Sequence, residues 1–208
     1  MLKKQSKNAK ITLSILFIFI GLVLISFNYF DGIKNNLFND KNIKLMNQTI
    51  SIYEEIKEID EDEYNNYIFD EPTDEYIGTL IIDKINLNRG FYSIDSKYNN
   101  VDQNIMVVEK SNMPNITNGN LILASHSGSS SISFFKNLYL LELNDKASVK
   151  YKNRTYNYKL VNIYTDKKDG DVVVSRDANS TILTLITCTK NDNTTQTIYI
   201  FELQNIDK

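Results

Sequence analysis

The chain begins with one uninterrupted apolar stretch. Residues Ile11 to Phe27 include no charge and no proline, and with Tyr29 and Phe30 they approach the roughly 20 residues that cross a bilayer as a helix. Four lysines precede the stretch, at positions 3, 4, 7 and 10. Since positive charge marks the cytoplasmic side, the pattern predicts a cytoplasmic tail over residues 1–10, a transmembrane helix over 11–30 and an exported remainder.

A cleaved signal peptide would show the same order of charge and hydrophobicity. Cleavage requires small residues at the end of the apolar run, and Ser26-Phe27-Asn28 matches that requirement poorly. The sequence therefore favours an uncleaved signal anchor, which crosses the cell membrane once and leaves the following domain outside the cell.

After the apolar stretch, the pattern is that of an amphipathic helix and then of a linker. Apolar residues from Ile43 to Tyr53 follow the three-and-four spacing of one helical face. An acidic run from Glu54 to Glu63 follows, in which like charges repel each other. The run contains no glycine-bearing calcium loop, so we expect a juxtamembrane helix and a solvated linker over residues 31–75.

From Tyr76 onward, short β-branched and aromatic runs are separated by Asn, Gly and Asp, as is typical of strands. Asn153 between two runs predicts a hairpin, and the spacing of apolar residues predicts a helix over Ser133 to Leu141. Many short strands with little helix favour an antiparallel barrel or sandwich. The predicted strands are Ile77–Asp83, Arg89–Ile94, Ile105–Glu109, Asn120–Ser125, Ala147–Tyr151, Arg154–Tyr164, Asp171–Val174, Thr181–Cys188 and Thr197–Leu203.

Composition narrows the chemistry that is available. The 208 residues contain one cysteine and one histidine, so neither an internal disulfide nor a zinc cluster of Cys and His is possible. We therefore expect no metal and no cofactor. The net charge of −3 includes the basic N-terminal tail, which makes the exported part more acidic and disfavours nucleic acid as a partner.

The cysteine and the histidine each stand at the end of a predicted strand. Cys188 ends an apolar run and is followed by a polar loop, and His126 ends another run before Ser127-Gly128. Alone, such a cysteine is often a small buried hydrophobe, and a lone histidine is often a surface residue. Together they can form a nucleophile and its proton partner, because an imidazolium stabilises a thiolate and can protonate a departing amine.

These residues resemble the sortase family, the membrane-anchored cysteine transpeptidases of Gram-positive bacteria. Thr184-Leu-Ile-Thr-Cys188 matches the family's Thr-Leu-x-Thr-Cys motif, and Asn120 to His126 is similar to its Asn-x-x-x-Ala-x-His strand, with serine where glycine is common. Ile77 to Ile85 resembles the opening strand, with aspartate in place of a proline. The resemblance implies a mostly β catalytic domain over residues 76–208, a closed antiparallel or mixed barrel of about eight strands with short helices.

The resemblance also implies a reaction in two halves. Cys188 attacks the scissile carbonyl of a C-terminal sorting motif on an exported protein, and His126 protonates the leaving amine, so that an acyl thioester forms. An amine from a lipid-linked peptidoglycan precursor or a pilin lysine then resolves the thioester. Because a helix precedes the barrel and no membrane segment follows Lys208, we expect a class B-like or related specialised enzyme.

One position departs from the family. Sortases carry an arginine at the start of the strand after the cysteine, where it helps to hold the sorting peptide and the oxyanion, and here that position is Gln196. An amide can donate hydrogen bonds to an oxyanion, but charge-assisted bonds are roughly twice as strong. The chain has three arginines, Arg89, Arg154 and Arg176; any of them could reach the site from another strand, but we expect each on the surface.

Two alternatives stay open. A cysteine peptidase would use the same Cys188 and His126 with water as the acceptor, although in papain-like enzymes the cysteine precedes the histidine and begins a helix. A sortase-fold binding or scaffold module at the cell surface would keep the barrel with weak or no turnover. Gln196, in place of arginine, is the feature that favours the module.

Overall fold

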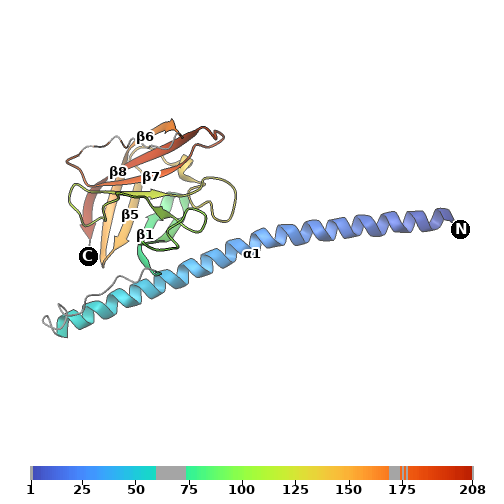
Figure 1. The fold of residues 1–208 in the computed structure, drawn as a ribbon, viewed down its shortest axis with the longest axis horizontal. Coiled ribbons are helices and arrows are strands. Elements are labelled where there is room, and N and C mark those ends of the chain that lie inside the picture. Colours follow the sequence, from blue (N-terminus) through green and yellow to red (C-terminus); the bar gives the residue numbers. More distant parts are fainter. Residues whose placement is uncertain (1, 60–73, 169–173, 175, 177, 208) are drawn as a thin grey trace. The chain divides into compact units, whose positions relative to one another are not determined.

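One long helix, α1 (Leu2–Ile59), begins the chain in the computed structural model (Figure 1). The structure describes residues 2–59, 74–168, 174, 176 and 178–207. The chain divides into two compact units, Met1–Phe38 and Asn39–Lys208. In the first unit the large apolar side chains from Ile11 to Ile25 are exposed, and α1 is long and apolar enough to cross a membrane.

The second unit begins with the remaining part of α1, whose apolar face packs on the start of the sheet. Met46 is buried in a cluster with Tyr76 and Tyr92. The buried Asn39 accepts a hydrogen bond from the Gly90 backbone N–H at 3.0 Å. The amphipathic helix predicted after the apolar stretch is therefore confirmed. The apolar packing around Met46 explains its three-and-four spacing.

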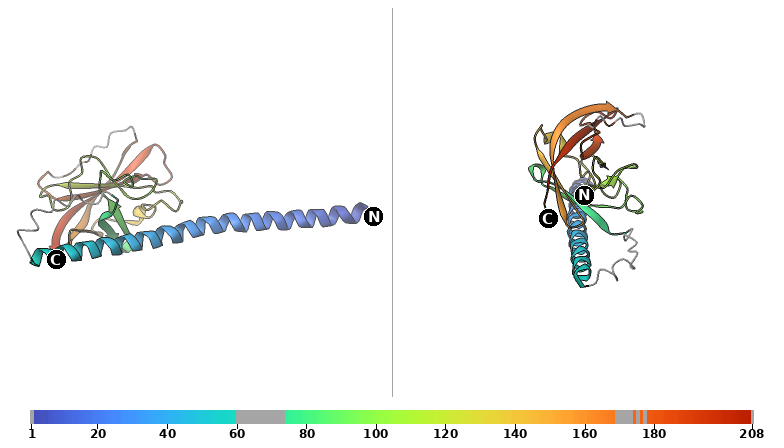
Figure 2. Two further views of the ribbon diagram at one scale, coloured as in Figure 1. Left: turned by 60° about the horizontal axis from the view of Figure 1, so that its bottom comes forward. Right: turned by 90° about the vertical axis from the view of Figure 1, so that its left-hand side faces the viewer.

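Eight strands in the described residues form one sheet that curls into a nearly closed barrel (Figure 1). The order is β2-β1-β5-β6-β8-β7-β4-β3, and a parallel bridge between Phe91 and Ile105 joins the two edges of the sheet. The long strands β6 and β8 run side by side around the barrel (Figure 2), and only β4 and β7 pair in parallel among the named strands. The strands are β1 (Tyr76–Ile82), β2 (Leu87–Tyr92), β3 (Met106–Val107), β4 (Asn120–Ala124), β5 (Lys146–Tyr151), β6 (Arg154–Lys167), β7 (Ile182–Cys188) and β8 (Thr195–Asp207), with 3-10 helices η1 (Asp83–Ile85) and η2 (Leu138–Leu140).

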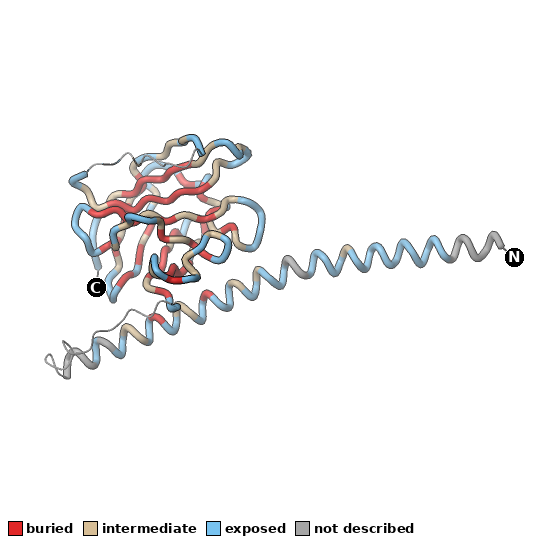
Figure 3. The backbone as a smooth tube through the Cα atoms, viewed as in Figure 1, coloured by how far each residue is buried: buried red, intermediate tan, exposed pale blue. Residues whose placement is uncertain are grey.

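The barrel interior holds the main hydrophobic core (Figure 3). Leu80 and Phe201 have no exposed surface, as expected for inward positions of strands whose side chains alternate. Strand β7 is buried on both faces, because Leu185 enters the core while Ile186 packs in a second cluster with Ile198. This double burial explains why β7 has a nearly continuous apolar sequence.

The predicted mixed barrel of about eight strands is confirmed, and most predicted strands are present with small differences at their ends. The hairpin is also confirmed, since Lys152 and Asn153 join β5 to β6 with φ values of 43° and 49°, the left-handed region that tight hairpin turns require. The strand predicted at Asp171–Val174 falls mostly outside the described residues, and Val174 does not belong to a strand. The acidic linker prediction likewise falls mostly on residues outside the description, 60–73.

The helix predicted over Ser133–Leu141 is wrong in form. Turns occupy most of the segment, and only η2 is helical, with 3-10 geometry. The backbone N–H of Phe135 donates to the carbonyl of His126 at 3.0 Å, so the chain folds back on the end of β4 instead of building an α-helical ladder. The apolar spacing still leads to burial, because Phe135, Leu138 and Leu141 are buried in the core.

Candidate active site

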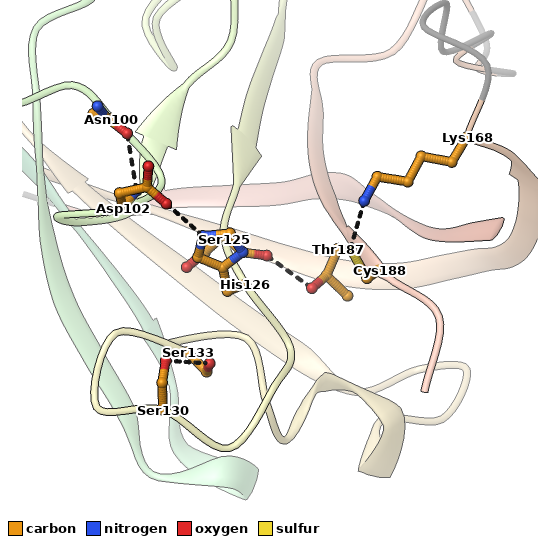
Figure 4. A network of polar contacts seen from close by, with 9 residues as sticks. All are labelled: Asn100, Asp102, Ser125, His126, Ser130, Ser133, Lys168, Thr187 and Cys188. Atoms are coloured by element: carbon orange, nitrogen blue, oxygen red, sulfur yellow. Dashed lines mark hydrogen bonds and ion pairs between the residues drawn. The ribbon is translucent and has the colours of Figure 1, made fainter. Parts of the chain in front are cut away.

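The candidate site lies where two parallel strands end side by side. Strands β4 and β7 pair in register up to Ala124 and Ile186, and the Ser125 N–H still donates to the Ile186 carbonyl at 3.3 Å. His126 and Cys188 stand two residues beyond the last pair. Because neighbouring parallel strands point the same way, both residues come to one end of the barrel (Figure 4).

Two threonines of β7 hold the strands in this register. The buried Thr184 hydroxyl donates to Oδ1 of Asn120 at 2.9 Å. The buried Thr187 hydroxyl donates to the Ser125 carbonyl at 2.8 Å (Figure 4). Buried hydroxyls require hydrogen-bond partners, so these two bonds explain why an apolar strand carries threonine at both positions. They also set the backbone directly before the histidine and the cysteine.

Asp102 is the acidic partner of His126. Its Oδ1 lies 3.0 Å from Nε2 of His126, which makes an ion pair when the imidazole is protonated. Asp102 belongs to the loop between β2 and β3, where its backbone N–H donates to Oδ1 of Asn100 at 2.9 Å. The carboxylate side chain is 74% exposed, so water screens the charge. Asp102 was not among the site residues predicted from the sequence, because nothing in its spacing distinguishes it from other loop aspartates.

Lys168 is the basic partner of Cys188. Its Nζ lies 3.4 Å from the Cys188 sulfur, and the cysteine is half-buried. Lys168 directly follows β6, and its backbone N–H donates to the Thr194 carbonyl at 2.9 Å. In Figure 4 the four side chains run in the order Asp102, His126, Cys188, Lys168. An acidic group thus adjoins the imidazole and a basic group adjoins the thiol, an arrangement that suits an imidazolium and a thiolate.

Comparison with known families shows where this arrangement belongs. The model for the sortase domain matches residues 80–203, which include both motif strands and both candidate residues. The chain belongs to the sortase family. The resemblance drawn from the Thr-Leu-Ile-Thr-Cys and Asn-Leu-Ile-Leu-Ala-Ser-His runs is therefore confirmed at the level of the family.

Solved sortase structures share the fold. The lid mutant of sortase A from Corynebacterium diphtheriae matches with a TM-score of 0.58 and 20% identity, over 69% of this chain and 80% of that one. The sortase D5 transpeptidase from Clostridium perfringens gives 0.57 and 20%, over 78% and 99%. Sortase C1 from Streptococcus agalactiae gives 0.56 and 28%, over 67% and 72%. A comparison with curated proteins finds no match. Structures of sortases A, D5 and C1 thus match this chain with similar TM-scores. The assignment to a class B-like enzyme stays a prediction.

Gln196 of this sortase lies directly opposite Cys188 in the β7–β8 pair. Its Nε2 donates to the Lys167 carbonyl at 3.3 Å. The amide at the position where the family resemblance expects arginine therefore bonds to the end of β6, next to Lys168. A direct role of Gln196 at the oxyanion stays a prediction.

The expectation of surface arginines is wrong for Arg89, while the other two arginines are exposed. Arg89 is 5% exposed; its Nε donates to Oδ1 of Asn104 at 2.7 Å, and its guanidinium carbon lies 3.9 Å from the Phe134 ring centroid. Burial lowers the pKa of Arg89. An amide and an aromatic face replace the lost hydration of the cation. Arg89 thus links two segments of the chain: the loop that contains Asp102, and the segment that follows His126.

A cavity of about 240 Å³ opens beside Cys188. Its walls include the aromatic rings of Tyr139 and Tyr199, and the Lys190 ammonium lies 3.3 Å from the Tyr139 ring centroid. Burial raises the pKa of Tyr199 to about 12, so its phenol stays neutral at physiological pH. Ser127, whose hydroxyl donates to the Cys188 carbonyl at 2.7 Å, also lines the cavity. The cavity offers mixed apolar and polar space for a group bound next to the sulfur.

Proposed function

We propose that this sortase is a cysteine transpeptidase that cleaves a C-terminal sorting motif of exported proteins and transfers the acyl fragment to an amine. The supporting observation is that His126 and Cys188 end neighbouring parallel strands whose register is held by buried threonines. The half-buried thiol borders a cavity, so substrate can reach it. The proposal assigns Cys188 as nucleophile and His126 as the proton carrier.

The first half-reaction forms a thioester. The Cys188 thiolate attacks the scissile carbonyl carbon, and the carbonyl π electrons move to oxygen to give a tetrahedral oxyanion. When the oxyanion collapses, the C–N bond breaks and the amine of the departing tail takes a proton from the His126 imidazolium. The acyl fragment stays on the sulfur and His126 is left neutral.

The second half-reaction resolves the thioester. An acceptor amine attacks the thioester carbonyl, and neutral His126 takes the proton that the amine loses. Collapse of the second oxyanion breaks the C–S bond and restores the thiolate and the imidazolium. A peptidoglycan precursor or a pilin lysine supplies such an amine.

The N-terminal segment has a physical purpose in this proposal. Residues 1–10 stay in the cytoplasm, residues 11–30 cross the membrane, and residues 31–75 link the anchor to the catalytic domain, 76–208, outside the cell. Enzyme, membrane-retained substrate and lipid-linked acceptor are then confined to one surface. Such confinement raises their effective concentration without any new contact.

The test uses the full-length chain in detergent, incubated with a positional-scanning library of peptides, with and without glycinamide as the added amine. Mass spectrometry then identifies the products. A transpeptidase gives an acyl fragment that carries glycinamide, and the Cys188→Ala chain gives none. Fragments that carry only water, whatever the amine concentration, would identify a peptidase, and a library bound but uncleaved would identify a binding module.

A further inference from the structure

The sulfur of Cys188 is contacted by a cation that lies just beyond the end of another strand, β6. The Lys168 Nζ is 3.4 Å from Sγ, within the distance at which an ammonium donates to sulfur. In the barrel order β6-β8-β7, the lysine extends from the end of β6 past β8 to the cysteine on β7. The long, flexible stem of lysine suits such a reach.

The backbone that carries Lys168 is held in place. Strand β6 pairs with β8 up to Lys167 and Thr195, and the Lys168 N–H adds a bond to the Thr194 carbonyl at 2.9 Å. The Gln196 amide donates to the Lys167 carbonyl at 3.3 Å. The backbone from which the lysine side chain extends is therefore bonded to β8 and to the turn directly before it.

Gln196 does not supply the charge that the reaction favours at this point. A neutral amide gives an ordinary hydrogen bond, whereas an ammonium gives a charge-assisted one to a thiolate or an oxyanion. Negative charge resides on sulfur before attack and on the substrate oxygen afterwards, and these atoms are separated by two bonds through the carbonyl carbon. One cation beside the sulfur can therefore stabilise both states.

We propose that Lys168 is the catalytic cation of this site, which stabilises the Cys188 thiolate and the oxyanion formed from it, while Gln196 positions the backbone from which Lys168 extends. The proposal deepens the proposed function and rests on Cys188 being the nucleophile. Lysine from β6 then supplies the positive charge while glutamine occupies the facing position on β8.

Other charged groups near the thiol must be separated from Lys168 in any test. His126 ends the neighbouring strand, with Asp102 on its imidazole. Lys136 and Lys190 line the cavity beside Cys188, and the Lys190 ammonium lies against the Tyr139 ring. Substituting Lys168 alone changes the group that touches the sulfur and leaves these charges in place.

The experiment compares four full-length chains in detergent: unsubstituted, Lys168→Met, Lys168→Arg and Lys167→Met. Lys167 is an exposed neighbour, so its substitution removes the same charge one residue away. The first readout is the rate of Cys188 alkylation by iodoacetamide between pH 5 and 10, which requires no peptide substrate. The second is the rate of acyl-enzyme formation with a peptide that the unsubstituted chain cleaves.

With Lys168→Met we expect Cys188 alkylation near neutral pH to slow about tenfold, since an adjacent cation favours the thiolate form that attacks the reagent. Acylation should fall about tenfold, less than the 10²–10³ that a buried oxyanion donor supplies, because Lys168 is exposed. Lys168→Arg should restore most of both, Lys167→Met should leave both unchanged, and about 1 M salt should reduce the differences.

Two outcomes would overturn the proposal: an alkylation profile and acylation rate of Lys168→Met equal to those of the unsubstituted chain, or an equal effect of Lys167→Met. Equal acylation rates of the unsubstituted chain and Lys168→Met would reject Lys168 as the catalytic cation and leave the proposed transpeptidase function intact. A Lys168-dependent alkylation profile without acylation of any library peptide would reject the transpeptidase and still support Lys168 as the cation on the sulfur.

Discussion

Oδ1 of Asp102 lies 3.0 Å from Nε2 of His126, although the two residues are 24 positions apart and belong to a loop and a strand end. A carboxylate bonded to one ring nitrogen selects the ring orientation and the tautomer. Asp102 does not touch the sulfur in Figure 4, so it acts through the histidine, as a positioning residue.

Substitution of Asp102 should therefore affect turnover more than binding. We expect Asp102→Ala to lower kcat by roughly tenfold with little change in KM, because the exposed ion pair supplies modest energy but fixes the ring. Asp102→Asn should be intermediate, since an amide keeps a hydrogen-bonding group there. Steady-state kinetics with a cleaved peptide provide the test, with the exposed loop residue Asp95→Asn as control. A change confined to KM would contradict the positioning role.

The Thr187 hydroxyl should contribute measurably to stability. Thr187→Val keeps the shape of the side chain but leaves the Ser125 carbonyl without this donor, at a cost of about 1 kcal/mol. Thr187→Ser keeps the hydroxyl and should cost less. Urea unfolding of the full-length chain can be followed by near-UV circular dichroism of its 13 tyrosines, because the chain has no tryptophan. Equal stability of the Val and Ser variants would refute the assigned bond.

The buried Arg89 should depend on Asn104 for its hydrogen bonding, and the fold should lose stability without it. In Asn104→Ala the guanidinium loses the acceptor of its 2.7 Å bond in a site where water is excluded, which costs about 1–3 kcal/mol. Asn104 also donates to the Gly90 carbonyl at 2.8 Å, so its loss frees the loop that carries Asp102. Urea unfolding measures the stability, and hydrogen exchange of the loop amides measures the loosening. Unchanged exchange would show that the loop is held by other contacts.

The turn between β7 and β8 should resist acid until low pH. Hydrogen bonds from the Thr194 hydroxyl, then from the Thr194 backbone and the Thr195 hydroxyl, lower the pKa of Asp192 to about 2. A lowered pKa in the folded state stabilises the turn above the ordinary carboxyl pKa of about 4, and that contribution is lost as the pH falls toward 2. The carboxyl ¹³C shift of Asp192 should titrate near pH 2. Titration near pH 4 would contradict the hydrogen-bonded turn.

Much of the barrel was predictable because its strands are short β-branched and aromatic runs separated by Asn, Gly and Asp. Cys188 and His126 were predictable as strand ends, since polar loops follow both at once. Their placement at one end depends on the parallel pairing of β4 and β7, which is a property of the whole topology and not of either strand.

The partners of the two candidate residues were not predictable in the same way. Asp102 and Lys168 are exposed charges at loop positions, and only the closed barrel brings them to the imidazole and the sulfur. Arg89 occupies an inward position that alternation assigns to an apolar residue, and its burial depends on Asn104 and Phe134, which come from later segments. The helix predicted after His126 failed because a backbone bond back to the histidine replaced the helical ladder.

The mass of the cysteine-bearing peptide, after the full-length chain has been incubated with a cleaved substrate and quenched in acid, tests whether Cys188 carries the acyl group. We expect an acyl adduct on Cys188 that hydroxylamine removes, and no adduct in Cys188→Ala or His126→Ala. An adduct that persists in the Cys188→Ala chain, or substrate cleavage by that chain at the unsubstituted rate, would contradict the role of Cys188 as nucleophile.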